Sequence, residues 1–141
     1  MGIKSTFKMD KLAALIKKYG PFCDVVIERL NYKLEYIENL IELEVIARNI
    51  EHSNFNVYEN ILIKFNKIKE FKFYESMGST NHITLLDCNI LRINGLYVFD
   101  FIPWGENLTD LDDIRKSNFY IICEDFEFTS SPVVRAVPNE D

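Results

Sequence analysis

The chain has 141 residues, of which 48% are hydrophobic and 27% are charged, and its net charge is −6. This length fits one domain, which we expect to span residues 1–141, and the chain is too apolar to be disordered. No apolar stretch approaches the ~20 residues that a spanning helix needs, so we expect a soluble protein with no membrane partner. Its cysteines are odd in number and widely spaced, which favours free, buried thiols in a reducing cytoplasm: Cys23, Cys88 and Cys123.

The negative charge is concentrated at one end of the chain. Residues 99–141 contain three basic and ten acidic residues, whereas the rest of the chain is nearly balanced. Such a surface repels nucleic-acid phosphates and anionic lipids, and it steers basic proteins toward itself. We therefore expect a basic protein partner and no nucleic acid.

The first predicted element is a short helix with one buried face. Four apolar residues recur at helical spacing: Leu12, Leu15, Ile16 and Tyr19. Asp10 can cap the first turn through its side chain, and the pair Gly20 and Pro21 ends the helix.

The hydrophobic period then changes from about four to two, which predicts strands. Residues 23–34 and 38–49 alternate in this way, and "EYIEN" between them is a hairpin turn. Residues 57–66 and 67–75 predict two further strands, with a bend or bulge at Lys69 and Glu70, where the alternation shifts.

Three more strands are predicted in the second half of the chain. Residues 82–91 and 95–103 flank Asn94-Gly95, a strong hairpin signal, and residues 119–128 form the last strand. Between them, "WGENLTDLDDIRKSN" is irregular with a helical turn in its middle. Residues 130–141 are predicted to be a flexible tail.

Together these elements predict an α+β domain. A short N-terminal helix precedes about seven mostly antiparallel strands, which form either a curled sheet or a two-layer sandwich.

The acidic segment is the main candidate for a functional site. Its carboxylates permit three interpretations: a solvated rim, a surface for a basic protein, or a metal site. The ordered spacing of a helix-loop-helix calcium site is absent, so we expect no metal. Trp104 beside it either closes one end of the core or is an exposed anchor for a partner. The predicted partner-binding residues are Trp104, Glu106, Asp110, Asp112, Asp113, Glu124, Asp125 and Glu127.

No catalytic arrangement is recognisable in the sequence. His52 lies beside Glu51 and Ser53, but a triad is assembled from distant segments, so this adjacency gives no catalytic geometry. There is no glycine-rich phosphate loop and no zinc spacing. We therefore expect neither an enzyme nor a cofactor.

Three segments carry a resemblance to known proteins. These are "FCDVVIERLNYKLEYIENLIELEVIARN", "YENILIKFNKIKEFKF" and "NFYIICEDFEF". The layout, over residues 22–128, resembles small bacterial domains that act as immunity proteins of polymorphic toxin systems. Many such domains have His before the Asp of the first segment, where this chain has Cys23 before Asp24. The resemblance implies inhibition of a cognate toxin by binding, with no catalytic residue to carry over.

Two alternatives remain open at this stage. The chain is rich in Phe, Tyr and Trp, at 13%, and these could line a small-ligand pocket in a curved sheet. A structural subunit of a larger assembly is the other alternative.

Overall fold

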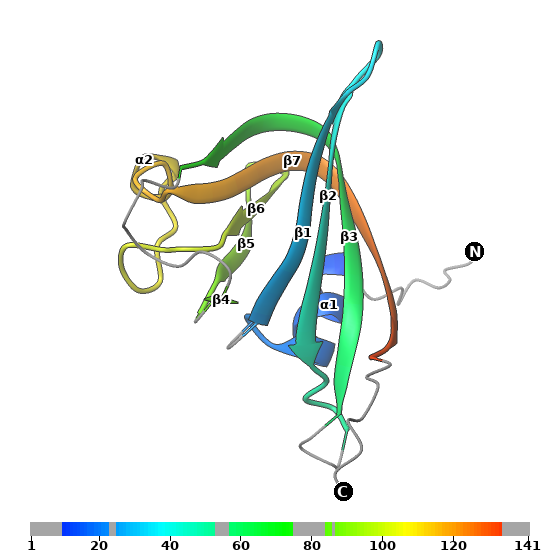
Figure 1. Ribbon diagram of the computed structural model, residues 1–141. Coiled ribbons are helices and arrows are strands. Elements are labelled where there is room, and N and C mark those ends of the chain that lie inside the picture. Colours follow the sequence, from blue (N-terminus) through cyan, green and yellow to red (C-terminus); the bar gives the residue numbers. More distant parts are fainter. Residues whose placement is uncertain (1–9, 23–24, 53–56, 75–83, 86, 134–141) are drawn as a thin grey trace, which may run out of the picture.

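The described part of the chain is mostly β, with one antiparallel sheet and two short helices (Figure 1). The computed structural model describes residues 10–22, 25–52, 57–74, 84–85 and 87–133. The elements in chain order are α1 (Lys11–Tyr19), β1 (Val25–Leu34), β2 (Asn39–Arg48), β3 (Tyr58–Phe73), β4 (Thr84–Leu85), β5 (Asn89–Ile93), β6 (Leu96–Asp100), α2 (Leu111–Ile114) and β7 (Phe119–Pro132). The strand order is β4-β1-β2-β3-β7-β6-β5, and every neighbouring pair is antiparallel. Of the two predicted arrangements, the single curled sheet is the one that forms.

Helix α1 begins and ends where the sequence predicts, but its cap differs. Asp10 occupies the N-cap position, yet its side chain makes no capping hydrogen bond. Instead, the Tyr97 hydroxyl on β6 donates to Asp10 Oδ1 at 3.5 Å, so this carboxylate links the helix to the sheet. At the other end, Glu59 of β3 accepts hydrogen bonds from the Tyr19 hydroxyl at 2.5 Å and from Asn49 Nδ2 at 2.8 Å. Both ends of α1 are thereby tied to strands.

Strand β3 corrects the prediction of two separate strands at residues 57–66 and 67–75. It is one continuous strand, and the predicted bulge lies within it, as a register shift between Ile68 and Glu70. Lys67 just before the shift has a φ of 54°, a left-handed conformation that reverses the local alternation. A bulge increases local twist, and β3 and β7 bend together over the top of the molecule in Figure 1.

The predicted strand at residues 82–91 is interrupted and forms two short strands. β4 pairs with β1, whereas β5 pairs with β6, and these lie at opposite edges of the sheet. Only four peptide steps separate Leu85 from Asn89, a span of at most about 14 Å. The two sheet edges must therefore approach each other at this end, as they do in a rolled sheet.

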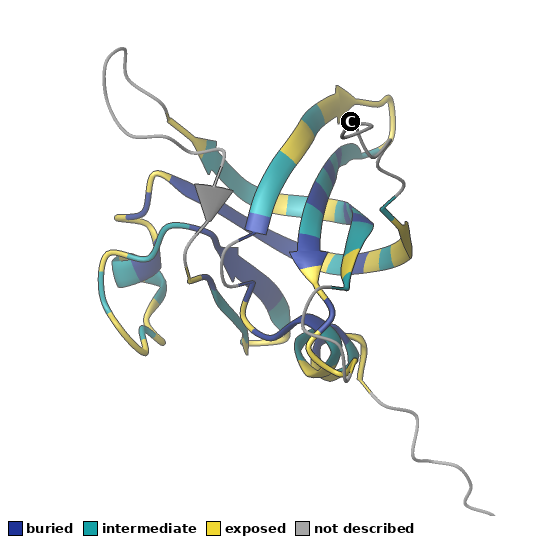
Figure 2. Cartoon of the chain, turned by 60° about the horizontal axis from the view of Figure 1, so that its bottom comes forward, coloured by how far each residue is buried: buried dark blue, intermediate teal, exposed yellow. Residues whose placement is uncertain are grey.

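The main core lies on the inner face of the rolled sheet. Alternate residues of β2 and β3 point into it, together with one side of α1 and an aromatic cluster from β6 and β7. Figure 2 shows this alternation as buried and less buried bands along the central strands. The cluster is held by close ring contacts: the ring centroids of Phe65 and Phe99 lie 4.8 Å apart, and those of Phe99 and Phe126 lie 5.1 Å apart.

A second, smaller core lies on the other face of β6 and β7. Here Val98, Tyr120 and Ile122 are covered by Ile114 of the predicted helical turn, which forms α2. The loop that carries most of the predicted site residues is therefore packed onto the sheet. Its helical turn is a structural element with its own buried side chain.

Two further predictions have definite outcomes. The last strand continues to Pro132, so residues 130–132 belong to β7 and not to a tail, and residues 134–141 lie outside the described residues. Cys123 is free and buried, as predicted, Cys88 is buried, and Cys23 lies outside the described residues. Within the described ranges, neither helix has the length and apolarity to cross a membrane.

Candidate functional site

The loop between β6 and β7 brings together Trp104 and the first acidic residues. Asp110 is the N-cap of α2, and its side chain accepts a hydrogen bond from the backbone N–H of Asp112 at 2.8 Å. This Asp-capped turn is what the sequence pattern favours at a helix start. The Asp110 carboxylate therefore has a structural task, and it stabilises the loop that presents its neighbours.

Arg115 joins this loop to the sheet. Its guanidinium makes a bidentate contact with Glu70 of β3, with Nη2 to Oε1 at 2.6 Å and Nε to Oε2 at 3.0 Å. It also contacts Asp112 Oδ1 at 3.2 Å. The hydrogen bonds from Arg115, aided by the Tyr120 hydroxyl, lower the pKa of Glu70, although partial burial opposes this effect. The charge of the Asp112 carboxylate is therefore partly neutralised by a cation of its own chain.

Trp104 is an exposed side chain, because 57% of its surface is accessible. The alternative in which it closes the core is therefore wrong. Lys116 Nζ lies 4.6 Å from the centroid of its ring and 3.3 Å from Asp113 Oδ1. The lysine covers part of the indole and pairs with the carboxylate, which makes a compact aromatic, basic and acidic cluster at the surface.

The acids of β7 are not part of this cluster. Glu124 forms a salt bridge with Lys69 at 2.7 Å, and Asp125 forms one with Lys11 of α1 at 2.6 Å. These hydrogen-bonded ion pairs lower the pKa of both carboxyls. Glu127 is exposed and lies opposite Lys64 in the register of β3 and β7. The eight predicted residues thus fall into two groups, one in the loop and one along β7.

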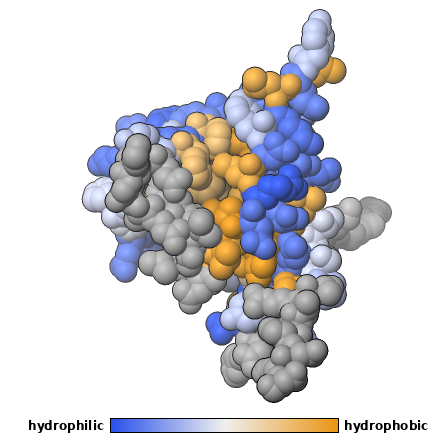
Figure 3. Space-filling model, viewed as in Figure 1, coloured by the Kyte–Doolittle hydropathy of each residue, from blue (hydrophilic) through white to orange (hydrophobic). Residues whose placement is uncertain are grey.

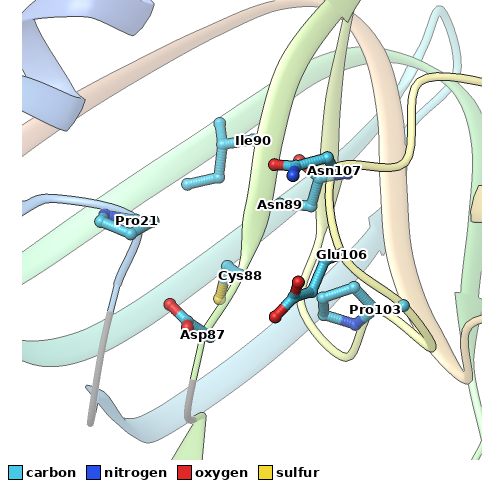
Figure 4. Close-up of a pocket in the computed structure, with 9 residues that line it drawn as sticks. Pro21, Asp87, Cys88, Asn89, Ile90, Pro103, Glu106 and Asn107 are labelled. Atoms are coloured by element: carbon cyan, nitrogen blue, oxygen red, sulfur yellow. The ribbon is translucent and has the colours of Figure 1, made fainter.

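A pocket beside the loop includes residues that the sequence did not indicate. It has a volume of about 500 Å³, and the side chains of Asp87, Cys88 and Glu106 line it from two segments (Figure 4). Asn89 Nδ2 donates to the carbonyl of Leu108 at 2.7 Å and so fixes the loop against β5. Nearly twenty residues separate Asp87 from Glu106, so no sequence spacing predicts that they lie together. They line one pocket because the loop approaches β5 in the fold.

A buried carboxylate lies under the same loop. Asp100 ends β6 and is fully buried, opposite Asn89 on one side and Tyr120 on the other. Among the described residues, neither of its carboxylate oxygens has a partner at hydrogen-bonding geometry, although Ser117 and the backbone of Ile102 lie close enough to affect it. Burial raises the pKa of Asp100 to about 6, and Ser117 and the backbone of Ile102 oppose this effect only in part. The only sequence signal is an aspartate inside the apolar run "LYVFDF".

The chemistry available to this region is that of recognition. Among the described residues, no three His, Cys, Asp or Glu side chains are placed to hold a metal ion. The loop offers an exposed indole, paired carboxylates and one acidic pocket, which suit a cationic or mixed aromatic and basic ligand. Comparisons with protein-family models, curated proteins and solved structures give no match. A proposal for the function therefore depends on the residues and geometry of this chain.

Proposed function

We propose that this chain is a cytoplasmic protein-binding domain that inhibits a basic protein by masking it, in the manner of an immunity protein bound to its toxin. The observation that carries this proposal is the exposure of Trp104 within the acidic loop. Tryptophan is a frequent interface hot spot because it buries a large rigid surface with little loss of entropy. An exposed indole surrounded by carboxylates suits a partner whose apolar contact is ringed by lysine or arginine.

The charge distribution supports the same partner. The net charge is −6, and the excess of acid lies in residues 99–141. In the part of the chain that the structure describes, Glu106 and Glu127 take part in no salt bridge. These two carboxylates are free to meet cations of a partner, while the overall field raises the rate of encounter. Asp112, Asp113, Glu124 and Asp125 contribute to that field but already have cations beside them.

The test begins with capture of partners from the native host at low and moderate salt, followed by kinetics with the purified partner. We expect one basic protein, whose activity the chain inhibits and whose association rate falls as salt rises. Trp104→Ala should speed dissociation about tenfold or more, and Glu106→Lys should slow association. Neither side chain caps a helix or enters the core, so both variants should fold.

Glu28→Lys is the matched control, because Glu28 is an exposed acid on β1, outside the acidic loop. It should change association less than Glu106→Lys does. Unchanged kinetics for Trp104→Ala and Glu106→Lys would show that the acidic loop is not the binding surface. Absence of any basic partner would contradict the inhibitor function itself.

A second candidate function rests on the pocket beside the loop. Asp87 and Glu106 give it two carboxylates, so the ligand class would be a small organic cation such as a polyamine. Trp104 lies between the lining residues Pro103 and Gly105, so its fluorescence should report occupancy. Titration with spermidine that leaves this fluorescence unchanged would count against the pocket.

A further inference from the structure

The hairpin formed by β1 and β2 ends in an apolar tip that no described part of the chain covers. Tyr36 is fully exposed, and Ile37 and Leu34 are 88% and 78% exposed. We call residues 34–38 the hairpin tip. In Figure 1 this tip extends well past the rest of the sheet, and Figure 3 shows apolar side chains at that end of the molecule. Three large apolar residues within four positions of a projecting turn make an exposed apolar surface.

Closing the hairpin does not require these residues. The connection between β1 and β2 is made by residues 35–38, and polar turn residues such as Asn and Gly would close it at least as well. The β5 and β6 hairpin of this same chain does close on Asn94 and Gly95, both with positive φ. The apolar residues of the tip therefore have no role in the fold that explains them.

The stem below the tip is well supported. Tyr32 packs against Phe71 with ring centroids 5.3 Å apart, and its hydroxyl accepts a hydrogen bond from Asn39 Nδ2 at 3.0 Å. Lys33 Nζ lies 3.4 Å from Glu42 Oε1, across the two strands. These contacts hold the hairpin in one shape, so little conformational entropy is lost when the tip is buried by a partner.

The charges around the tip indicate what kind of partner fits. Glu35 and Glu38 flank Tyr36 and Ile37, and within the described residues no salt bridge reaches either acid. The two nearest basic residues of the hairpin, Arg29 and Lys33, are already paired with Glu42. The tip is therefore an apolar centre with an acidic border, and its complement is an apolar pocket bordered by Lys or Arg.

We propose that the hairpin tip is a second contact element, which inserts Tyr36 and Ile37 into an apolar, basic-bordered pocket of a partner protein. This inference rests on the proposed function, because the partner is the same basic protein. It goes beyond the proposed function because it places an anchor on the β1–β2 hairpin, which carries none of the predicted site residues. A membrane suits the tip less well, because Glu35 and Glu38 are repelled by anionic headgroups.

The first test is a photocrosslink made in the native host with the full chain. Tyr36→p-benzoylphenylalanine should crosslink to a basic protein on irradiation, and Tyr58→p-benzoylphenylalanine should not. Tyr58 is the matched control because it is also an exposed tyrosine, 45% accessible, but lies at the start of β3, opposite Arg48 at the far end of β2 from the tip. Absence of a crosslink from position 36 would overturn the proposal.

The second test is affinity for the crosslinked protein after both proteins are purified. The double variant Tyr36→Ser with Ile37→Ser should weaken binding at least tenfold, mainly by faster dissociation, and Tyr58→Ser should leave it unchanged. The tip makes no core contact, so thermal unfolding of the double variant should match the parent. Equal affinity of parent and double variant would overturn the proposal.

The two surfaces can be separated by their variants. Loss of binding in the tip variant with no effect of Trp104→Ala would support the tip and refute the acidic loop; the reverse pattern would refute the tip. Two other occupants have their own signatures, and either would overturn the proposal. Binding to anionic vesicles that the double variant loses would identify a membrane contact. A concentration-dependent dimer that the double variant abolishes would identify a second copy of this chain.

Discussion

Asp100→Asn should stabilise the protein increasingly as the pH rises from about 4 to about 8. The folded protein holds this carboxyl at a pKa of about 6, above its ordinary value of 3.8, because burial disfavours the charged form and Ser117 and the backbone of Ile102 offset this only in part. Between these values the folded chain binds more protons than the unfolded chain, so stability falls as the pH rises. Asparagine cannot ionise and removes that dependence.

The size of the effect follows from the shift. A pKa of about 6 in place of 3.8 lowers the free energy of unfolding by roughly 3 kcal/mol once the pH exceeds both values. At pH 4.5 the native carboxyl is nearly all protonated, and about 1 kcal/mol of this penalty has already developed, so about 2 kcal/mol develops between pH 4.5 and pH 8. The buried amide of asparagine has its own unsatisfied groups, but their cost is the same at both pH values. The diagnostic quantity is therefore the change in the mutational effect with pH.

Urea unfolding of the parent and of Asp100→Asn at pH 4.5 and pH 8 measures this quantity. The other carboxyls titrate alike in both proteins, so the difference between the proteins isolates Asp100. Glu28→Gln serves as the control, because this exposed residue should give the same small effect at both values of pH. A mutational effect for Asp100→Asn that is equal at pH 4.5 and pH 8 would refute the argument. It would mean that the carboxylate is solvated or paired in the folded chain.

Three further predictions concern single contacts. Glu70→Gln should cost below about 1 kcal/mol at pH 7, since the pair with Arg115 is partly exposed. This cost should fall as the pH is lowered from 4.5 through the lowered pKa of Glu70; a cost in urea unfolding that does not decrease with falling pH would contradict the ion-pair explanation. The Cys123 thiol is buried with its pKa raised to about 12, so iodoacetamide at pH 8 should alkylate it only after unfolding, as peptide mass spectrometry would detect. Gly95→Ala should cost about 1 kcal/mol in urea unfolding because Gly95 has a φ of +81°, although its added Cβ would meet no atom within 4 Å; an unchanged midpoint would show that the turn adapts.

Much of the fold can be predicted from local pattern. The helical spacing of Leu12 to Tyr19, the alternation in β1 and β2, and the Asn94-Gly95 turn each depend on residues close in sequence. The interruption between β4 and β5 cannot be predicted in this way. It arises because the rolled sheet brings its two edges together, and each short strand pairs with a different partner. That geometry depends on long-range pairing, which periodicity does not contain.

The candidate site shows the same division. The excess of carboxylates and the presence of Trp104 are visible in the sequence, and the cap formed by Asp110 is a local signal. The partners of Asp125 and Glu124 are not visible, because Lys11 is 114 residues from Asp125 and Lys69 lies on a different strand. The sequence therefore overestimates how much of the acidic charge is free to meet a partner.

The internal pairing of these acids separates two properties of the proposed interface. Paired carboxylates still contribute to the net charge of −6. The field of this charge acts over about a Debye length and raises the rate of encounter. They add little to the lifetime of a complex, since contact with a partner's cation must compete with the cation already present. Residence time must then come mainly from large uncharged side chains that the fold leaves exposed, which are Trp104 in the loop and Tyr36 with Ile37 in the hairpin tip. Salt should accordingly act on association, and truncation of these three side chains on dissociation.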